Sequence, residues 1–471
     1  MVVVLGVDIG STTTKAALVE VTDAVSVVRV ARRPTPSGVD DLLATCAVVA
    51  RECAAAAAAP IAAIGIASMG ESGAALDANG RALTPLLRWD RRVDRRHLDG
   101  LLAAHPGLPA STGIPATTKP AAVALGALRD EHPEVHGRMR YWAGAADLLG
   151  HALTGERATD HTLAARTMLA GLGDAWTIDV IESLGVRVDA LPSLRAPGEA
   201  AGATTIAAAS FGLSPGIPVH IAGHDHAVGA WAAGARRPDD TVDSLGTSEA
   251  IVRIADAVDV ARAVDEGFAV GRTVDGSAAT ILGGSPSCGA MIAWWDQEFP
   301  EDRMRDRLAA LTPAAWVASP TIVLPYPSGR QCPDPQPLAR AQVFGDGDAE
   351  DRVRGLLQSL VAQSRWIRET ADLLAGSPAT TVTMIGSLAR RIPIWAPLTA
   401  ASGPPTAMCA AEEPVAAGSA LLAAVRASAV DPETTILSRE QVAPLNDPVR
   451  DDTYRRFRMA IDPAAVPEGE S

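Results

Sequence analysis

Positions 8 to 15 combine groups that suit phosphate binding. The run reads Asp8-Ile9-Gly10-Ser11-Thr12-Thr13-Thr14-Lys15. A tight turn of glycine and hydroxyl residues presents backbone N–H groups and hydroxyls to phosphate oxygens, and the residues that supply them here are Gly10, Ser11, Thr12 and Thr13. Lys15 adds a positive charge. Asp8 is placed to hold Mg²⁺ through water, because Mg²⁺ takes few carboxylates and keeps several waters. The plainer alternative is a hairpin turn with a solvated lysine.

A second turn of this kind is Gly246-Thr247-Ser248, which follows the run Val242-Asp243-Ser244-Leu245. Turns of glycine with threonine and serine occur in many sheets. This turn therefore indicates a phosphate site only in combination with the first one. Together the two turns would hold a nucleotide from both sides.

Asp225 lies between two apolar stretches, 218–223 and 227–235. A carboxylate in that place can accept the proton of a bound hydroxyl, as phosphoryl transfer requires. Two other interpretations stay open. Asp225 could serve only as a helix N-cap, or His224 and His226 could form a metal pair, although three or four ligands are usual and no third is evident nearby.

Two loops follow strand-like runs and combine glycine with charged and aromatic side chains. They are Ala67-Ser68-Met69-Gly70-Glu71-Ser72-Gly73 and Arg88-Trp89-Asp90-Arg91-Arg92. Carboxylates bind pairs of sugar hydroxyls, and tryptophan packs against a ring face. The loops thus predict sugar contacts, although each one taken singly is better explained as a solvated loop.

These groups need strands and helices to position them, and the sequence predicts a mixed α/β chain. The predicted strands are Val2–Val7, Lys15–Val21, Ile61–Ala67 and Pro218–Gly223, and the predicted helices are Asp41–Ala59, Pro120–Glu131 and Ala227–Ala235, with Tyr141–Leu153 as strand or helix. The polar run 236–240 breaks two apolar stretches and predicts domains 1–237 and 238–471. Each domain would open with a hairpin, and a cleft between the two would hold the nucleotide.

Composition narrows the class of protein further. The chain has 471 residues, 48% of them hydrophobic, and a formal net charge of −14. Such a charge argues against a broad nucleic-acid surface, which needs stripes of Lys and Arg. The opening residues lack the pattern of a signal peptide, and the alanine-rich stretch 53–67 falls short of a spanning helix. We therefore expect a cytoplasmic protein without a membrane partner.

In their order, these motifs resemble the FGGY family of carbohydrate kinases, within the fold shared by hexokinase, actin and the Hsp70 chaperones. The resemblance covers almost the whole chain. Residues 8–15 resemble the first phosphate motif of the family, and Ser244-Leu245-Gly246-Thr247-Ser248 resembles the second. Gly223-His224-Asp225-His226-Ala227 falls where the family carries its catalytic aspartate.

Substrate loops of the family are also matched. Glu71 matches the glutamate of the Gln-Arg-Glu loop in glycerol kinases, and Trp89-Asp90-Arg91-Arg92 is similar to the next substrate loop. Asp147, followed by Leu153-Thr154-Gly155-Glu156, resembles an Asp-Tyr-Leu … Leu-Thr-Gly segment. The resemblance implies that the sugar contacts are Glu71, Trp89, Asp90, Arg92, Asp147 and His226.

Other positions depart from the pattern of the family. The triple-glycine adenine loop is replaced by Met384-Ile385-Gly386-Ser387-Leu388-Ala389-Arg390, whereas Gly289 matches a better preserved phosphate element. Gly386 and Ser387 are therefore the candidates for the adenosine end. Met69 and Gly70 replace polar groups, which predicts more room and fewer polar contacts in the sugar pocket.

The resemblance implies two similar actin-like (ribonuclease H-like) α/β domains with a catalytic cleft between them. It implies ATP and Mg²⁺ as cofactors, and phosphorylation of a ketose or polyol hydroxyl with Asp225 as the general base. A homodimer is one assembly that it allows. A decayed kinase that only binds sugar is the alternative. An actin-like or chaperone-like ATPase would leave the loops at Glu71 and Asp90 unexplained.

Overall fold

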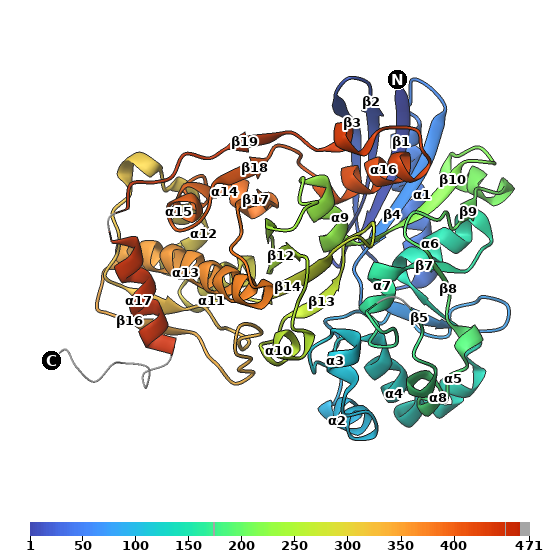
Figure 1. Ribbon diagram of the computed structural model, residues 1–471, viewed down its shortest axis with the longest axis horizontal. Helices are drawn as coiled ribbons and strands as arrows, with labels where there is room; N and C mark the ends of the chain where they lie inside the picture. Colours follow the sequence, from blue (N-terminus) through green and yellow to red (C-terminus); the bar gives the residue numbers. More distant parts are fainter. Residues whose placement is uncertain (173–174, 448, 462–471) are drawn as a thin grey trace. The chain divides into compact units, whose positions relative to one another are not determined.

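A computed structural model describes residues 1–172, 175–447 and 449–461, and the chain forms two compact units (Figure 1). The first unit comprises Met1–Arg236, Ala269–Thr280 and Glu413–Ser438. The second comprises Arg237–Phe268, Ile281–Glu412 and the residues from Arg439 on. The contiguous domains 1–237 and 238–471 stay a prediction. The compact units differ from them because 269–280 and 413–438 pack with the first unit.

The first unit contains the following strands and helices. Its strands are β1 Val2–Ile9, β2 Thr13–Val21, β3 Val25–Pro34, β4 Ile61–Ser68, β5 Gly73–Leu76, β6 Tyr141–Gly144, β7 Ala158–Asp160, β8 Ser193–Arg195, β9 Gly202–Ala203, β10 Pro218–His224 and β13 Ala269–Arg272. Its α-helices are α1 Val39–Ala54, α2 Arg95–Ala104, α3 Leu108–Thr112, α4 Ala121–Glu131, α5 Pro133–Arg138, α6 Ala145–Thr154, α7 His161–Ala165, α8 Ile178–Ser183, α9 Asp225–Ala232 and α16 Pro414–Arg426, and short 3₁₀ turns lie at Val188–Ala190, Ile206–Phe211 and Pro432–Thr435.

The second unit is built in the same way. Its strands are β11 Asp240–Leu245, β12 Glu249–Ala255, β14 Ala279–Ser285, β15 Ile322–Leu324, β16 Gln342–Phe344, β17 Thr381–Ile385, β18 Thr406–Cys409 and β19 Arg439–Gln441. Its α-helices are α10 Val260–Asp265, α11 Gly289–Glu298, α12 Met304–Ala310, α13 Ala349–Ala375, α14 Ser387–Arg391, α15 Trp395–Ala401 and α17 Arg450–Ile461, and 3₁₀ turns lie at Pro300–Asp302 and Pro313–Ala315.

The two main sheets repeat one topology. The sheet of the first unit has the order β3-β2-β1-β4-β10-β9, and that of the second unit includes the order β14-β12-β11-β17-β18-β19. In both, an antiparallel hairpin (β1 with β2, β11 with β12) is followed by two parallel strands and an antiparallel edge strand. The two predicted hairpins and the predicted α/β class are thereby confirmed.

Most predicted elements occur close to their predicted bounds. The stretch 141–153 is both strand and helix, because β6 ends at Gly144 and α6 begins at the next residue. The predicted helix Asp41–Ala59 is shorter, since α1 ends at Ala54. The predicted helix Ala227–Ala235 begins earlier, since α9 starts at Asp225. The extended backbone of His224 is the N-cap, which makes Asp225 the first helical residue and excludes it as the N-cap.

Helix α16 packs unusually close to the sheet of the first unit, against β1 and β4 (Figure 1). A Cβ atom on Gly6 would lie 2.0 Å from the Ala416 carbonyl oxygen, and one on Gly65 would lie 1.8 Å from that of Ser419. Only glycine allows this approach. The Ser419 hydroxyl lies within hydrogen-bonding distance of the Val7 carbonyl, 3.3 Å away. A segment from late in the chain therefore completes the core beneath the first strands.

No helix among the described residues has the length and apolar character needed to cross a membrane.

Candidate active site

Three parallel strands of the first unit end at the same edge of its sheet. Strand β1 pairs Ile9 with Ser68 of β4, and β10 pairs His224 with the same Ser68. The turn after β1, the loop after β4 and Asp225 therefore emerge side by side. Open α/β sheets place their ligands at the carboxyl ends of their strands. The topology thus brings the first phosphate turn, the Glu71 loop and Asp225 to one edge of the sheet.

The first phosphate turn connects β1 to β2 and is held by one backbone bond and one side-chain bond. The Gly10 N–H donates to the Thr13 carbonyl at 3.2 Å, and the Thr35 hydroxyl donates to the Gly10 carbonyl at 2.7 Å. Thr12 is exposed at the tip, while Ser11 is only partly exposed. The turn is therefore a rigid, accessible set of N–H groups and hydroxyls, as phosphate binding requires.

Lys15 lies directly across the hairpin from Asp8. Its ammonium is 3.3 Å from Asp8 Oδ2 and 3.1 Å from Glu413 Oε2. Glu413 also accepts from Arg32 Nε at 2.7 Å. Despite partial burial, the two carboxylates raise the pKa of Lys15 above its ordinary value. Lys15 is thus a fixed, permanently charged group beside the turn.

Asp8 has the chemistry of a cation ligand. It is 3% exposed, and its Oδ1 atom has no hydrogen-bond partner among the described residues. Burial raises the pKa of Asp8 to about 6, and the nearby charge of Asp225 acts in the same direction, while Lys15 opposes both. A buried carboxylate oxygen without a partner fits Mg²⁺ held through water.

Asp225 stands at the start of α9 between two histidines. Its Oδ1 accepts from the His226 N–H at 2.8 Å and lies 3.2 Å from His224 Nε2. Burial holds the pKa of His224 well below its ordinary value, so His224 is neutral. Potential ligand atoms of His224, Asp225 and His226 lie within 4.8 Å of one another. The metal-pair interpretation would therefore have Asp225 as its third ligand.

Glu71 is paired with a residue that the sequence interpretation missed, Arg166. Glu71 is 8% exposed and accepts a hydrogen bond from the Arg166 guanidinium. Arg166, followed by the charge of Lys119, lowers the pKa of Glu71 although burial alone would raise it. A Cβ atom on Gly70 would lie 2.5 Å from Arg166 Cγ and 2.9 Å from His224 Cδ2. The prediction of extra room at Gly70 is wrong, because Arg166 and His224 fill that space.

The Trp89 loop braces the phosphate turn. Trp89 Nε1 donates to Ser11 Oγ at 2.5 Å, and Arg88 donates to the Ser11 carbonyl at 2.5 Å. Asp90 accepts two bonds from Arg88, at 2.9 and 2.7 Å. Lys119 Nζ lies 5.2 Å from the centre of the Trp89 ring. Trp89 therefore joins the turn to the predicted sugar loops, while Asp90 is bonded to Arg88 and Arg92 is exposed.

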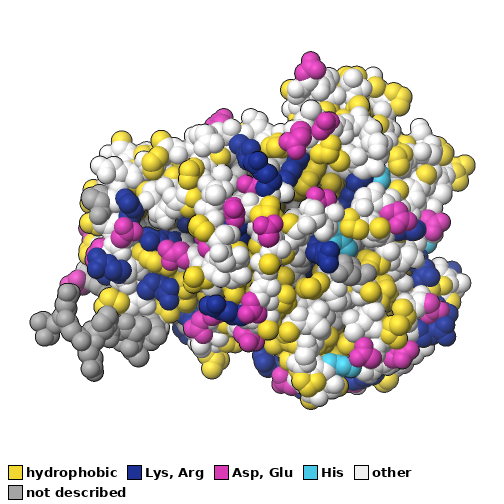
Figure 2. Space-filling view, viewed as in Figure 1, with side chains coloured by type: hydrophobic (Ala, Val, Ile, Leu, Met, Phe, Trp, Pro, Cys, Tyr) yellow, Lys and Arg dark blue, Asp and Glu magenta, His cyan; other side chains and the backbone are white. Residues whose placement is uncertain are grey.

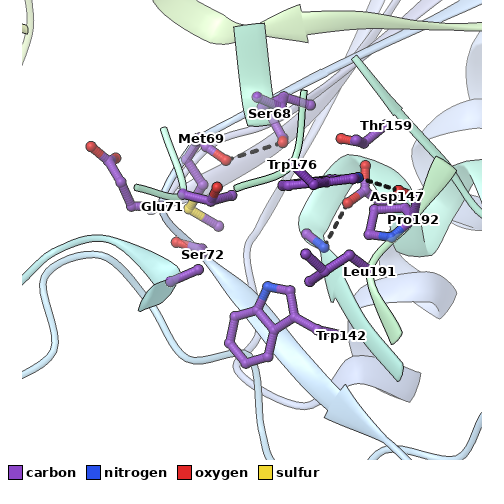
Figure 3. Close-up of a pocket in the computed structure, with 15 residues that line it drawn as sticks. Ser68, Met69, Glu71, Ser72, Trp142, Asp147, Thr159, Trp176, Leu191 and Pro192 are labelled. Atoms are coloured by element: carbon purple, nitrogen blue, oxygen red, sulfur yellow. Dashed lines mark hydrogen bonds between the residues drawn. The ribbon is translucent and has the colours of Figure 1, made fainter. Parts of the chain in front are cut away.

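Asp147 lines a small cavity of the first unit, and Glu71 is another of its lining residues (Figure 3). Its Oδ2 accepts from the Gly144 N–H at 2.8 Å and closes the first turn of α6. Burial raises the pKa of Asp147 to about 6, against the effect of that N–H group. Trp176 spans the cavity and donates to the Pro192 carbonyl. The predicted sugar contact by Asp147 is untested, and in the structure this residue caps α6.

The second phosphate turn lies in the second unit and is in contact with the start of α11. The Gly246 N–H donates to the Ser248 carbonyl at 3.0 Å and closes the turn, whose tip at Thr247 is exposed. The Gly289 N–H donates to the Gly246 carbonyl at 3.0 Å, and a Cβ atom there would lie 2.7 Å from the same oxygen. Gly289 therefore allows the start of α11 to rest on the turn.

Gly386 and Ser387 lie at the same sheet edge of the second unit as this turn. Strand β17 pairs in parallel with β11, Ile385 beside Ser244. Gly386 has φ +102°, and a Cβ atom there would lie 2.2 Å from the Leu245 carbonyl oxygen. Ser387 is exposed at the start of α14. The loop thus retains a glycine where the backbone permits no other residue.

Comparison with known proteins agrees with this arrangement. Residues 3–232 match the N-terminal domain of the FGGY family of carbohydrate kinases, and residues 243–427 match its C-terminal domain. The chain belongs to the FGGY family of carbohydrate kinases. The predicted family resemblance is confirmed.

Curated relatives of this FGGY chain are sugar kinases. It is 30% identical over 193 residues to the L-fuculokinase of Escherichia coli K12, covering 40% of this chain and 41% of the relative. It is 25% identical over 288 residues to the xylulose kinase of the same strain, covering 60% and 58%. The matches to the fuculokinase thus span about two fifths of its length.

Solved structures share the FGGY fold along nearly the whole chain. The xylulose kinase of Rhodospirillum rubrum has a TM-score of 0.83 at 24% identity, with 97% of this chain and 98% of that chain covered. The ADP-bound glycerol kinase of Plasmodium falciparum has a TM-score of 0.83 at 16% identity, with 99% of both covered. The predicted two-domain α/β fold is confirmed.

Three site residues of this FGGY chain escaped the sequence interpretation. Arg166 directly follows helix α7 (His161–Ala165), and the polar residues Asp160 and His161, where the short strand β7 ends, could have marked this segment. Arg88 directly precedes Trp89, and the sequence indicates only that it belongs to a loop with predicted sugar contacts. Glu413 is far from Lys15 in sequence, so no local pattern could have joined them.

Proposed function

We propose that this protein transfers the γ-phosphate of ATP to a hydroxyl of a ketose or polyol. The observation that carries the proposal is the shared sheet edge of the first unit, where Asp225, the Asp8 turn and the Glu71 loop emerge together. Phosphoryl transfer depends mainly on alignment and on charge stabilisation around the phosphates. A carboxylate, a phosphate turn and a sugar loop on neighbouring strands supply both.

Asp225 acts as the general base in this proposal. Its helix N-terminal position and the His226 N–H orient the carboxylate, and neutral His224 lies 3.2 Å from the same oxygen. The sugar is held by Glu71, with Arg166 as an added donor, because Arg166 Nε is buried and has no partner among the described residues. Trp89 offers a ring face beside the turn.

Each hairpin turn is a phosphate-binding element of its own unit: Lys15 and the N–H groups of the Gly10 turn are the donors in the first unit, and the N–H groups of the Gly246 turn are those in the second. The loop at Gly386 and Ser387 takes the adenosine end. Mg²⁺ held through water by Asp8 would neutralise charge on the phosphate oxygens. Lys15 keeps its charge at every physiological pH and orients the Asp8 carboxylate from the opposite strand.

The sugar pocket is more polar than the residues at positions 69 and 70 suggested. The Arg166 side chain fills the space next to Gly70 and forms an ion pair with Glu71. A carboxylate beside a guanidinium can bind adjacent hydroxyls through both donors and acceptors. This combination favours a polyhydroxylated substrate over one with an apolar end at this loop.

Charge on the surface gives no reason to propose a nucleic-acid partner. On the face drawn in Figure 2, Lys and Arg side chains of the described residues are interspersed with Asp and Glu. The net charge of −14 also argues against binding to the negatively charged backbone of a nucleic acid. No comparison favours the decayed-kinase alternative. A cytoplasmic location and a homodimer stay predictions.

A coupled assay of ADP release over a panel of ketoses and polyols tests the proposal, with Asp225→Asn as the decisive variant. We expect at least one sugar to support turnover, and the variant to lose about 10²- to 10⁴-fold in kcat, the usual contribution of a general base. Asp99→Asn, an exposed carboxylate on α2, serves as the matched control. Full turnover in Asp225→Asn would disprove the role of the base. Sugar binding without ATP binding in calorimetry would favour the decayed kinase.

A further inference from the structure

Asp225 follows a distorted strand end that other side chains hold in place. The pairing of β10 with β4 shifts register between Ile221 and Gly223, so β10 carries a bulge just before the catalytic aspartate. Bulges re-aim the side chains that follow them. Gly223 has φ +131°, a conformation that side chains rarely adopt. The direction of Asp225 therefore depends on what fixes this segment.

Thr162 of α7 fixes the far side of the bulge. The His224 N–H donates to the Thr162 hydroxyl at 2.8 Å, and that hydroxyl donates to Asp160 Oδ1 at 2.6 Å. Thr162 is 5% exposed and Asp160 is 3% exposed, so water does not compete for these bonds. A Cβ atom on Gly223 would lie 2.4 Å from the same hydroxyl. The glycine thus brings the backbone into contact with Thr162.

Asp160 is held ionised so that it can orient this hydroxyl. Its Oδ2 lies 3.3 Å from His161 Nδ1 and 3.4 Å from the Arg426 guanidinium. Although burial alone would raise the pKa of Asp160, His161 and Arg426 keep it below its usual value. An ionised carboxylate can only accept, so the Thr162 proton must point to Asp160. The lone pairs of the hydroxyl are then left for the His224 N–H.

Arg426 fixes the near side of the bulge. Its guanidinium donates to the Ile221 carbonyl at 2.7 Å and to the Val274 carbonyl at 2.7 Å. The bulge is therefore pinned at Ile221 from α16 and at His224 from α7. Figure 1 shows α7 and β7 beside β10, as these contacts require. Asp160, Thr162 and Arg426 form one buried network. It holds the end of β10 through bonds to Ile221 and to His224.

We propose that Thr162 is a positioning residue for the transfer reaction: its hydroxyl, oriented by Asp160, fixes the His224 backbone and so aims the Asp225 carboxylate at the substrate hydroxyl. The proposal rests on the proposed function of Asp225. Thr162 itself touches no reacting atom. Its loss should therefore reduce the chemical step and leave the binding of sugar and ATP nearly unchanged.

Thr162→Val, which keeps the shape and removes the hydroxyl, tests this inference. We expect kcat to fall about 10- to 100-fold, since small misplacements of a catalytic group cost up to that much. The Kd values for sugar and ATP, measured by calorimetry, should change less than about threefold. Thr162→Ser restores the hydroxyl and should recover most of kcat. If the valine variant does not fold, Thr162→Ala gives the same test with space for a water.

Thr112→Val is the matched control, because Thr112 is a buried threonine whose hydroxyl donates to Leu108 within its own helix. It should leave kcat unchanged. Wild-type kcat in the Thr162 variants that lack the hydroxyl, or equal loss in Thr162→Ser, would overturn the positioning role. If one of these results is found while Asp225→Asn abolishes turnover in the same assays, only the positioning role of Thr162 is overturned, and the proposed function stands. An active Asp225→Asn would overturn both proposals.

Discussion

The buried pair of Glu71 and Arg166 gives the sharpest stability prediction. Removing one partner of a buried ion pair costs about 3–5 kcal/mol, because the other charge stays desolvated. Arg166 keeps 16% exposure and Lys119 remains near Glu71, so we expect the lower limit for Arg166→Met, about 3 kcal/mol. At roughly 2–4 °C per kcal/mol for a domain of this size, the thermal midpoint should fall by about 6–12 °C.

The pH dependence of that loss identifies its cause. In the native protein the pKa of Glu71 is lowered, so its contribution is present above its ordinary range and is lost as pH falls through the folded value. Without Arg166, burial raises the pKa of Glu71 instead. The stability deficit of Arg166→Met should then be largest near pH 8 and shrink towards pH 5, as Glu71 takes up a proton.

Thermal unfolding of four proteins between pH 5 and 8 measures this: wild type, Arg166→Met, Glu71→Gln and the double variant. The double variant should be more stable than Arg166→Met, because no charge is left unpaired. Arg96→Met, which removes an exposed partner of Glu131, is the control and should move the midpoint far less. A deficit below about 1 kcal/mol, or one equal at pH 5 and pH 8, would refute the reasoning.

Two further predictions concern the nucleotide side. Gly386→Ala should cost more than about 2 kcal/mol in the second unit and weaken ATP binding, because the new Cβ meets the Leu245 carbonyl at φ +102°. Gly376→Ala, at φ +71° with open space around it, should cost only about 1 kcal/mol, and equal losses in urea unfolding would refute the steric cause. Because the pKa of Asp8 is about 6, the Mg²⁺ concentration for half-maximal rate should rise as pH falls from 7.5 to 5. A pH-independent Mg²⁺ requirement would count against Asp8 as the ligand.

The phosphate turns and the place of Asp225 were predictable because their signals are local. A β-branched run that ends in glycine and hydroxyls predicts the strand and turn at Gly10 wherever the rest of the chain goes. The predicted start of α9, at Ala227, was wrong because it was taken from the apolar run, whereas the helix begins earlier, at the polar residue Asp225. Apolar periodicity marks the buried face of a helix, whereas its first residue is set by the cap.

The pairs that give the site its electrostatics were not predictable in this way. Three strands and several helices separate Glu71 from Arg166 along the chain, and Glu413 meets Lys15 from almost the other end of the chain. Gly70 was interpreted as empty space because its missing side chain was visible in the sequence, and the guanidinium that fills the space was not. Charge partners of this kind follow from the topology of the whole unit.

The close packing of α16 on β1 and β4 has a consequence for biosynthesis. The ribosome completes the residues up to Arg236 long before it adds Glu413 and the helix that follows. At about 5–20 residues per second, the intervening stretch of roughly 180 residues takes about 10–35 s to make. During that time Gly6 and Gly65 present an uncovered strip of sheet backbone on the nascent chain. The first unit of this protein therefore completes its fold only after its final helix has been made, although most of this unit is translated first.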